Sequence, residues 1–352
     1  MSISLNNVTK RFSGQAVVDR VSLDIDDEEF FVFLGPSGCG KTTLMRLIAG
    51  LDVPDEGSVL LDGRIVFEGG RSTPPEERGV GVVFQSYALW PHMSVEQNVA
   101  FPVETHLNGR ELRDHVLACL SSVELDAFAQ RKPVTLSGGQ RQRVALARCL
   151  SQRAGTILMD EPLANLDPHL RHAMEDELVR FHRQTGATTL YITHDQREAM
   201  ALAHRIAVMW EGRLLQVGPP EEIYHQPMSA EVASFVGRSA LLSGRVVSSQ
   251  NGRAVFEIAS AGETEARCSA NTQKGPAELV VRPEDVTVEE SEQAVEGRVE
   301  SATYRGDHWE CRIATLGSGA AVLARTAHRL EAGVTVPLTI REAWILPNMP
   351  GY

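Results

Sequence analysis

The sequence contains few cysteines, and none of them has the spacing of a metal site or of a disulfide framework. There is no CxxC pair, and the count of five is odd, so neither a zinc site nor a set of paired disulfides is indicated. We therefore expect reduced thiols, as is usual inside cells. The five positions are Cys39, Cys119, Cys149, Cys268 and Cys311.

Long apolar runs are also missing. No stretch approaches the roughly 18 apolar residues that a membrane-spanning helix requires, and the opening MSISLNNVTKRF lacks the long apolar segment of a secretory signal. With 43% hydrophobic and 23% charged residues, the composition is that of a globular protein with sizeable cores. We therefore expect a soluble protein that meets a membrane only by docking against other proteins.

The chain has no surplus of basic residues. It carries 34 Lys and Arg against 46 Asp and Glu, which gives a formal net charge of -12. Because nucleic-acid backbones are bound mainly through an excess of Lys and Arg, we predict no nucleic-acid partner. Any polyanionic ligand would need a local site.

A length of 352 residues exceeds what one hydrophobic core usually serves, so two domains are expected. Across residues 1–235 short apolar runs alternate with segments of helical periodicity, which is typical of a mainly parallel sheet covered by helices. A more polar stretch at about 86–152 predicts an inserted helical subdomain. The expected strands, several of them apolar throughout as in buried parallel sheets, are Glu29–Leu34, Gly81–Phe84, Thr156–Asp160 and Thr188–Thr193.

Residues 240–352 differ from the first part in composition. Their segments are short, rich in β-formers and separated by Gly, Ser and Asn, as in GRVVSSQNGRAVFEI. This pattern predicts an all-β, OB-like domain, with two related β-modules as an open possibility.

The stretch GPSGCGKT at 35–42 matches the phosphate-binding pattern GxxxxGK[ST], with the apolar run FFVFL before it and a helical segment after it. Glycines let backbone N–H groups turn toward a phosphate, and the helix N-terminus adds positive potential. Lys41 is expected to reach the β- and γ-phosphates, and the Thr42 hydroxyl to ligate Mg²⁺. We therefore predict an α/β P-loop NTPase domain whose phosphate-binding residues are Gly35, Ser37, Gly38, Cys39, Gly40, Lys41, Thr42 and Thr43.

Polar side chains lie at or directly after the last residue of three of the expected strands. In TILMDE, Asp160 is predicted to face the magnesium and Glu161 to polarise the attacking water. His194 follows TTLYIT and is predicted to contact the γ-phosphate and position the water, while Gln85 follows GVGVVF and is predicted to touch the metal or the water. The alternatives are a solvated loop start for the two acids and an ordinary surface or core role for His194.

The stretch LSGGQRQR at 136–143 places two glycines at the start of a helix-forming run. Ser137, Gly138 and Gly139 are expected to form an N-terminal cap with free N–H groups, and such an end attracts an anion.

Together these residues resemble the ATP-binding subunit of an ATP-binding cassette (ABC) transporter. The order of the motifs matches, with PLANLD at 162–167 as the D-loop. The resemblance implies ATP and Mg²⁺ as ligands and a head-to-tail pair of copies, in which LSGGQ of one copy lies across the nucleotide of the other. It adds Ser137, Gly138, Gly139, Gln140 and Asp167 to the nucleotide site. It also implies that Phe12 stacks on adenine, whereas packing near Val18 in the core is the alternative.

In the second domain VRPEDV at 281–286 and TYRGDHWE at 303–310 resemble the transport-associated OB-like domain of importers. The resemblance implies an ATPase that energises solute import, bound peripherally at the cytoplasmic face of the inner membrane. Its implied partners are membrane permease subunits, received near Tyr87, Leu89, Trp90 and Met93, and indirectly an external solute-binding protein. We lean toward iron(III), polyamine or phosphonate as solute. The alternative is a soluble ABC ATPase without a membrane partner, against which the single LSGGQ argues.

Overall fold

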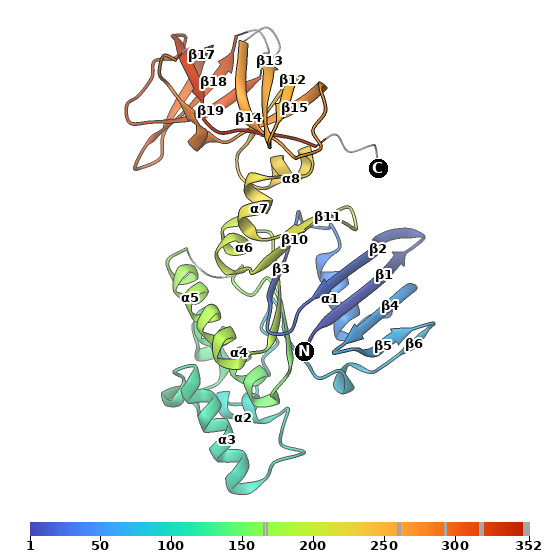
Figure 1. Cartoon of the computed structure of the whole chain (residues 1–352). Coiled ribbons are helices and arrows are strands. Elements are labelled where there is room, and N and C mark those ends of the chain that lie inside the picture. The colour runs from blue at the N-terminus through green and yellow to red at the C-terminus, as the bar shows by residue number, and fades with distance from the viewer. Residues whose placement is uncertain (165, 167, 259–261, 292–293, 317–319, 348–352) are drawn as a thin grey trace. The chain divides into compact units, whose positions relative to one another are not determined.

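The computed structural model describes residues 1–164, 166, 168–258, 262–291, 294–316 and 320–347 (Figure 1). The chain divides into two compact units, Met1–Pro220 and Glu221–Tyr352. Each unit is considered by itself.

A six-stranded sheet forms the centre of the first unit. Its strand order is β11-β10-β3-β9-β8-β7, and neighbouring strands from β10 to β7 run parallel. Every residue of β3 and β9 is buried, which explains their unbroken apolar or threonine-rich sequences. The predicted mainly parallel sheet is confirmed, with strands β3 (Phe30–Leu34), β7 (Val80–Val83), β8 (Thr156–Asp160), β9 (Thr188–Thr193), β10 (Arg205–Trp210) and β11 (Arg213–Gly218).

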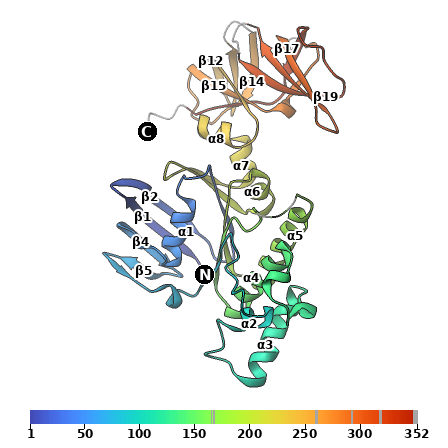
Figure 2. The ribbon, with the colours of Figure 1, turned by 180° about the vertical axis from the view of Figure 1, so that it is seen from behind.

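A second, antiparallel sheet was not predicted. Its order is β2-β1-β4-β5-β6, and helix α1 (Lys41–Ala49) lies between it and the central sheet in both views (Figures 1 and 2). The apolar face of α1 belongs to the core that joins the two sheets. The strands are β1 (Ile3–Phe12), β2 (Gln15–Ile25), β4 (Glu56–Leu61), β5 (Arg64–Glu68) and β6 (Arg71–Ser72).

The remaining α-helices of this unit lie away from the antiparallel sheet (Figures 1 and 2). Helices α2 (Val95–Ala100), α3 (Gly109–Ser122) and α4 (Gly138–Gln152) pack together within the stretch expected to be a helical subdomain. Helix α5 (Pro168–Thr185) contacts both α4 and α6 (Gln196–Leu202). Short 3₁₀ helices occur at Pro75–Glu77, Asp126–Phe128 and Pro133–Thr135.

The second unit is built from β-strands around one hydrophobic core, as predicted for an OB-like domain. Five strands close into a barrel in the order β12-β13-β14-β21-β15, and five more form a sheet in the order β16-β20-β17-β18-β19. The barrel strands are β12 (Ala240–Gln250), β13 (Arg253–Ile258), β14 (Gly262–Arg267), β15 (Gly275–Val281) and β21 (Trp344–Ile345). The sheet strands are β16 (Val286–Thr287), β17 (Val295–Tyr304), β18 (Trp309–Thr315), β19 (Ala321–Thr326) and β20 (Thr335–Ile340).

Two short helices lie at the start of the second unit. The sequence pattern assigns them to the first domain, whose predicted end is residue 235, whereas the compact units divide after Pro220. They are α7 (Pro220–His225) and α8 (Ala230–Phe235). The buried Arg282 guanidinium donates hydrogen bonds to the backbone oxygens of Tyr224, Ala233 and Val236, at or near the ends of both helices. Basic side chains satisfy the free carbonyls of helix C-termini in this way, so both helices are tied to the β-strands.

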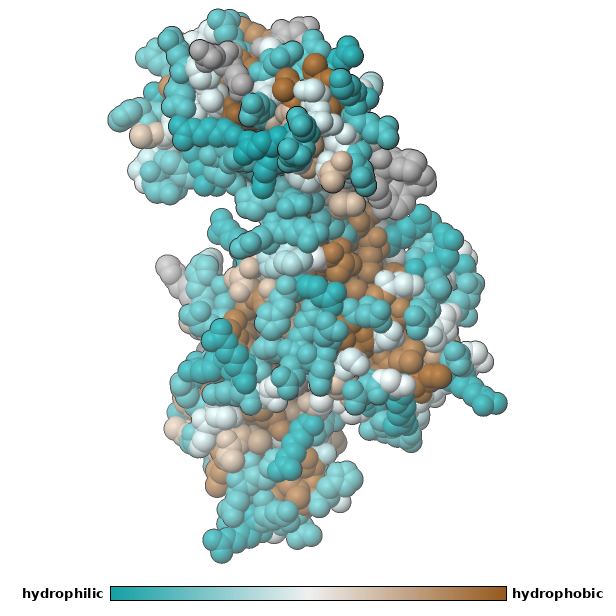
Figure 3. Space-filling model, in the orientation of Figure 1, coloured by the Kyte–Doolittle hydropathy of each residue, from teal (hydrophilic) through white to brown (hydrophobic). Residues whose placement is uncertain are grey.

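Among the described residues, no helix is both long and apolar enough to cross a bilayer. On the face that Figure 3 shows, hydrophilic residues predominate and hydrophobic ones occur in smaller areas.

Candidate active site

The loop at 35–40 is fixed in shape by two glycines that approach the backbone of neighbouring segments. A Cβ on Gly35 would lie 2.2 Å from the Met209 carbonyl oxygen, and one on Gly40 would lie 2.4 Å from that of Val17. Gly40 also has φ of 106°, which side chains other than glycine rarely allow. A larger residue at either position would therefore push the loop away from strands β2 and β10.

Lys41 places a buried positive charge inside this loop. Its Nζ donates to the carbonyl oxygens of Gly35 at 2.7 Å and Pro36 at 2.9 Å, and its charge also acts on the Asp160 carboxylate, whose pKa it helps to lower. Carbonyl oxygens carry no net charge to neutralise a buried cation, so the site suits a negatively charged ligand.

The start of α1 adds further donors. Gly40, the residue that precedes α1, provides no side-chain cap, so the first N–H groups of α1, including those of Thr42 and Thr43, have no partner within the helix. Ser37 and Gly38 are exposed at the mouth of the loop. Loop, lysine and helix start therefore fit a polyphosphate.

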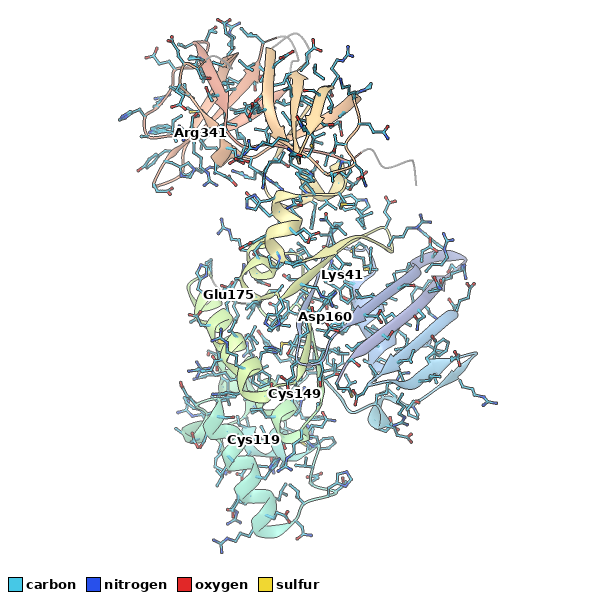
Figure 4. The ribbon with its side chains drawn as sticks, in the orientation of Figure 1. Lys41, Cys119, Cys149, Asp160, Glu175 and Arg341 are labelled. Carbon is cyan, nitrogen blue, oxygen red and sulfur yellow. The ribbon has the colours of Figure 1, made fainter. Side chains whose placement is uncertain are left out.

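Thr42 and Asp160 meet beside this loop, and Figure 4 labels Asp160 together with Lys41, the residue before Thr42. The Thr42 Oγ1 donates to Asp160 Oδ1 at 3.0 Å, which joins the start of α1 to the end of β8. Burial raises the pKa of Asp160, and the hydrogen bond from Thr42 opposes that rise. A hydroxyl and a single carboxylate suit Mg²⁺, which is usually held by one or two carboxylates together with phosphate oxygens.

Glu161 brings together three of the predicted catalytic residues. Its Oε1 lies 2.9 Å from His194 Nδ1, and its Oε2 accepts a hydrogen bond from Gln85 Nε2 at 3.4 Å. The Glu161 backbone is left-handed, with φ of 43°, and its N–H donates to the Ile192 carbonyl oxygen at 3.0 Å. The ends of β7, β8 and β9 therefore supply one carboxylate–imidazole–amide group.

The residues of LSGGQ form the cap predicted for them. Ser137 Oγ accepts from Gln140 N–H at 3.3 Å, and Gln140 Oε1 accepts from Ser137 N–H at 2.9 Å, which is a capping box at the start of α4. Ser137 is exposed, and a Cβ on Gly138 would lie 3.0 Å from Leu166. Among the described residues no hydrogen bond joins this cap to the loop at 35–42 of the same chain.

Phe12 lies at the surface, with 48% of it exposed. The alternative of a core phenylalanine is therefore wrong, while stacking on adenine stays a prediction. The Lys10 ammonium lies 5.4 Å from its ring centroid. Asp167 lies outside the described residues.

Comparison with known proteins decides the family. The ABC transporter family model matches residues 18–164, and the TOBE domain model matches residues 279–346. The spermidine/putrescine import ATP-binding protein PotA of Pseudomonas aeruginosa is 45% identical over 313 residues, covering 87% of this chain and 85% of the relative. The PotA protein of Marinobacter nauticus is 38% identical over 362 residues, covering 99% of this chain and 96% of the relative. This chain is an ABC transporter ATP-binding protein.

A solved structure supports the same assignment for the first unit. The dimeric ATP-binding cassette MJ0796, described as a post-hydrolysis state bound to ADP and Pi, is 33% identical with a TM-score of 0.56, covering 62% of this chain and 98% of that chain. The predictions of a P-loop ATPase fold, a transport-associated C-terminal domain and an ATP-hydrolysing importer subunit are therefore confirmed. Nothing in these likenesses favours the soluble ABC ATPase without a membrane partner.

Sequence reasoning did not select three charged residues that surround the active-site end of β9 in this ABC protein. Arg171 of α5 contacts both Asp195 and Glu198, and Glu198 is buried. Glu198 lies in the first turn of α6, which begins two residues after His194, and no motif in the sequence points to it.

Cys39 places a thiol that can be alkylated inside the phosphate loop. Its buried sulfur lies 3.6 Å from Lys41 Nζ. We expect complete alkylation of Cys39 to stop ATP turnover, because the added group would occupy the phosphate loop, and we expect bound ATP to slow the labelling. Turnover is measured by phosphate release, and a Cys39→Ser variant given the same treatment is the control. Unchanged turnover after full modification of Cys39 would contradict this prediction.

Proposed function

We propose that this ABC protein energises the uptake of a polyamine. The observation that supports this substrate class most is the likeness to spermidine/putrescine import proteins across both units, 38% identity over nearly the whole of each chain in one case. Of the three solutes toward which the sequence leaned, polyamine is the one that these relatives favour over iron(III) and phosphonate.

We further propose that the working form is a head-to-tail pair of copies. The exposed cap at Ser137 and the loop at 35–42 are each only part of a nucleotide site, and both present N–H groups of a helix start. Two such ends on opposite sides of a triphosphate would neutralise more charge than one. The related cassette whose structure is described as dimeric supports the pairing of two copies.

In the proposed site each residue has a defined task. Lys41 neutralises charge on the β- and γ-phosphates, and Thr42 with Asp160 holds Mg²⁺, which would offset phosphate charge during transfer to water. Glu161 accepts the proton of the attacking water, a general-base role. His194 contacts the γ-phosphate and helps to position the water, and its contact with Glu161 at 2.9 Å, together with that of Gln85 at 3.4 Å, keeps the Glu161 carboxylate oriented.

The permease surface is proposed around the segment that follows Gln85. Trp90 is half-buried and its ring lies 4.2 Å from that of the exposed Phe101, while Leu89 and Met93 are also half-buried. Tyr87 is buried and belongs to the interior of the subdomain rather than to its surface. Docking there would hold the protein peripherally at the cytoplasmic face of the membrane, with the external solute-binding protein acting through the permease.

A reconstituted transporter tests the function. The protein is combined in liposomes with the permease subunits encoded beside it, and uptake of radiolabelled spermidine, putrescine and iron(III) is measured with the cognate binding protein outside. We expect ATP-dependent uptake of a polyamine, and none with a Lys41→Ala variant. Uptake of iron(III) without polyamine would contradict the substrate, and ATP hydrolysis that no permease or binding protein changes would contradict the import role.

A further inference from the structure

Arg171 lies between the loop that follows Glu161 and the residues that flank His194. Its Nη2 donates to the Leu166 carbonyl oxygen at 3.3 Å, and its Nη1 donates to Asp195 Oδ2 at 3.2 Å. Its Nε lies 3.7 Å from Glu198 Oε1, which makes an ion pair without a hydrogen bond. One guanidinium therefore joins two separate segments, the loop that follows Glu161 and the start of α6 with its cap Asp195.

Glu198 fixes the first turn of α6 to strand β9. Its other oxygen, Oε2, accepts hydrogen bonds from Tyr191 Oη at 2.9 Å and from Thr193 Oγ1 at 2.7 Å. The side chain is only 4% exposed. Burial raises the pKa of Glu198, while these two hydroxyl donors oppose the rise by stabilising the carboxylate. A buried carboxylate with three partners holds its neighbours in one geometry.

His194 sits between two residues that this network holds. Thr193 bonds to Glu198, and the Asp195 N–H donates to Thr193 Oγ1 at 2.9 Å, while Asp195 Oδ1 caps α6 through the Arg197 N–H at 2.8 Å. The His194 ring itself is half exposed and contacts Glu161. Its orientation therefore depends on the backbone on either side of it.

The same residues line one small cavity. Its walls include the proposed catalytic pair Glu161 and His194 and, with them, Arg171, Asp195 and Glu198. The network therefore borders the reacting groups directly, and is not a remote surface ion pair.

We propose that Arg171 and Glu198 are positioning residues for ATP hydrolysis. Arg171 joins the loop after Glu161 to the backbone that carries His194, so that carboxylate and imidazole stay aligned on the same water and phosphate. This inference rests on the proposed role of His194. Arginine suits the task because its planar fork can bond to several groups at once, which a lysine ammonium cannot match.

The test compares Arg171→Gln, Arg171→Lys and Glu198→Gln with the parent protein in steady-state hydrolysis of saturating radiolabelled ATP. We expect kcat to fall on the order of tenfold to a hundredfold, the scale of a misaligned reacting group, while the Kd for ATP stays within about threefold, well under one tenfold step of affinity. Arg171→Lys should recover little of the loss. Arg180→Gln, on the same helix at an exposed ion pair, is the matched control and should hydrolyse ATP at the parental rate.

Combination with His194→Ala separates positioning from a merely structural role. If Arg171 acts through His194, adding Arg171→Gln to His194→Ala should reduce kcat no further, because residues that act as a unit are not additive. If the falls in kcat of the two single variants multiply in the double variant, or if Arg171→Lys keeps full activity, the proposal is overturned. If His194→Ala hydrolyses ATP at the parental rate, the proposed role of His194 is wrong. If His194→Ala is slow but the Arg171 and Glu198 variants hydrolyse ATP at the parental rate, His194 keeps its role and the positioning inference is wrong.

Folding is checked by thermal denaturation of each variant. Should Arg171→Gln or Glu198→Gln fail to fold, Asp195→Asn provides the same test, since asparagine caps a helix as well as aspartate and only the charge facing Arg171 is lost. We expect a smaller fall in kcat with unchanged ATP affinity, again absent in the His194→Ala background. A parental rate for this variant would count against the proposal.

Discussion

Replacing Glu161 with glutamine should slow ATP hydrolysis about a hundredfold to ten-thousandfold, the range that a positioned general base contributes. Glutamine has nearly the same size and can still contact His194 and Gln85, so the site should keep its shape and bind ATP. Because binding would continue without hydrolysis, the variant should accumulate as an ATP-bound pair of copies. Phosphate release measures the rate, and size-exclusion chromatography with ATP measures the pairing.

The matched control for this variant is Glu175→Gln. Glu175 lies on α5, and its carboxylate pairs with His172 of the same helix, so removing its charge should leave turnover unchanged (Figure 4). If Glu161→Gln hydrolysed ATP at the parental rate, another group would have to be the base. If it failed to bind ATP, the carboxylate would belong to binding and not to proton transfer.

Replacing Ser137 with glutamate should abolish turnover as completely as replacing Lys41 with alanine, yet a mixture of the two variants should regain activity. A carboxylate at the start of α4 would oppose the γ-phosphate held by the other copy. In a mixed pair, one site carries both defects and the other carries neither. If copies exchange freely, about half of the pairs are mixed, so about a quarter of the parental sites should be intact.

Two mixtures control this experiment. Parent protein mixed with Lys41→Ala shows whether one intact site per pair is enough for turnover. Parent protein mixed with the Lys41→Ala, Ser137→Glu double variant forms mixed pairs that contain no intact site, and should gain nothing. In both control mixtures, parent–parent pairs alone provide about a quarter of the parental activity, so only activity above that level reports on the mixed pairs. If the first control exceeds that level and the two single variants still fail to complement each other, Lys41 and Ser137 serve the same copy and the shared site is wrong.

The parallel sheet was the part of the fold that could be predicted best from the sequence. Strands β8 and β9 match their predicted bounds, and β7 is displaced by one residue, because each is buried on both faces and reads as an apolar run. The antiparallel sheet was missed because β1 does not alternate cleanly. Asn7 in its middle has φ of 49°, and register shifts there turn side chains to unexpected faces.

The active-site residues could be predicted individually, but their mutual arrangement could not. Strand ends in a parallel sheet meet at one edge, so Gln85, Asp160 and His194 were expected near one another. Which pairs touch depends on the backbone angle at Glu161, which no local pattern specifies. Arg171 was missed for a related reason, since its partners come from segments whose proximity only the folded chain establishes.

Glu161 has a left-handed backbone conformation, so the residue proposed to activate water also lowers the stability of the folded protein. A side chain in that region of φ and ψ is disfavoured by about 1 to 2 kcal/mol relative to the ordinary helical region, whereas glycine is not. A Glu161→Gly variant should relieve this strain and melt at a higher temperature than the parent protein, but it has no carboxylate to activate water. A variant chosen for thermal stability alone at this position would therefore lose its catalytic carboxylate.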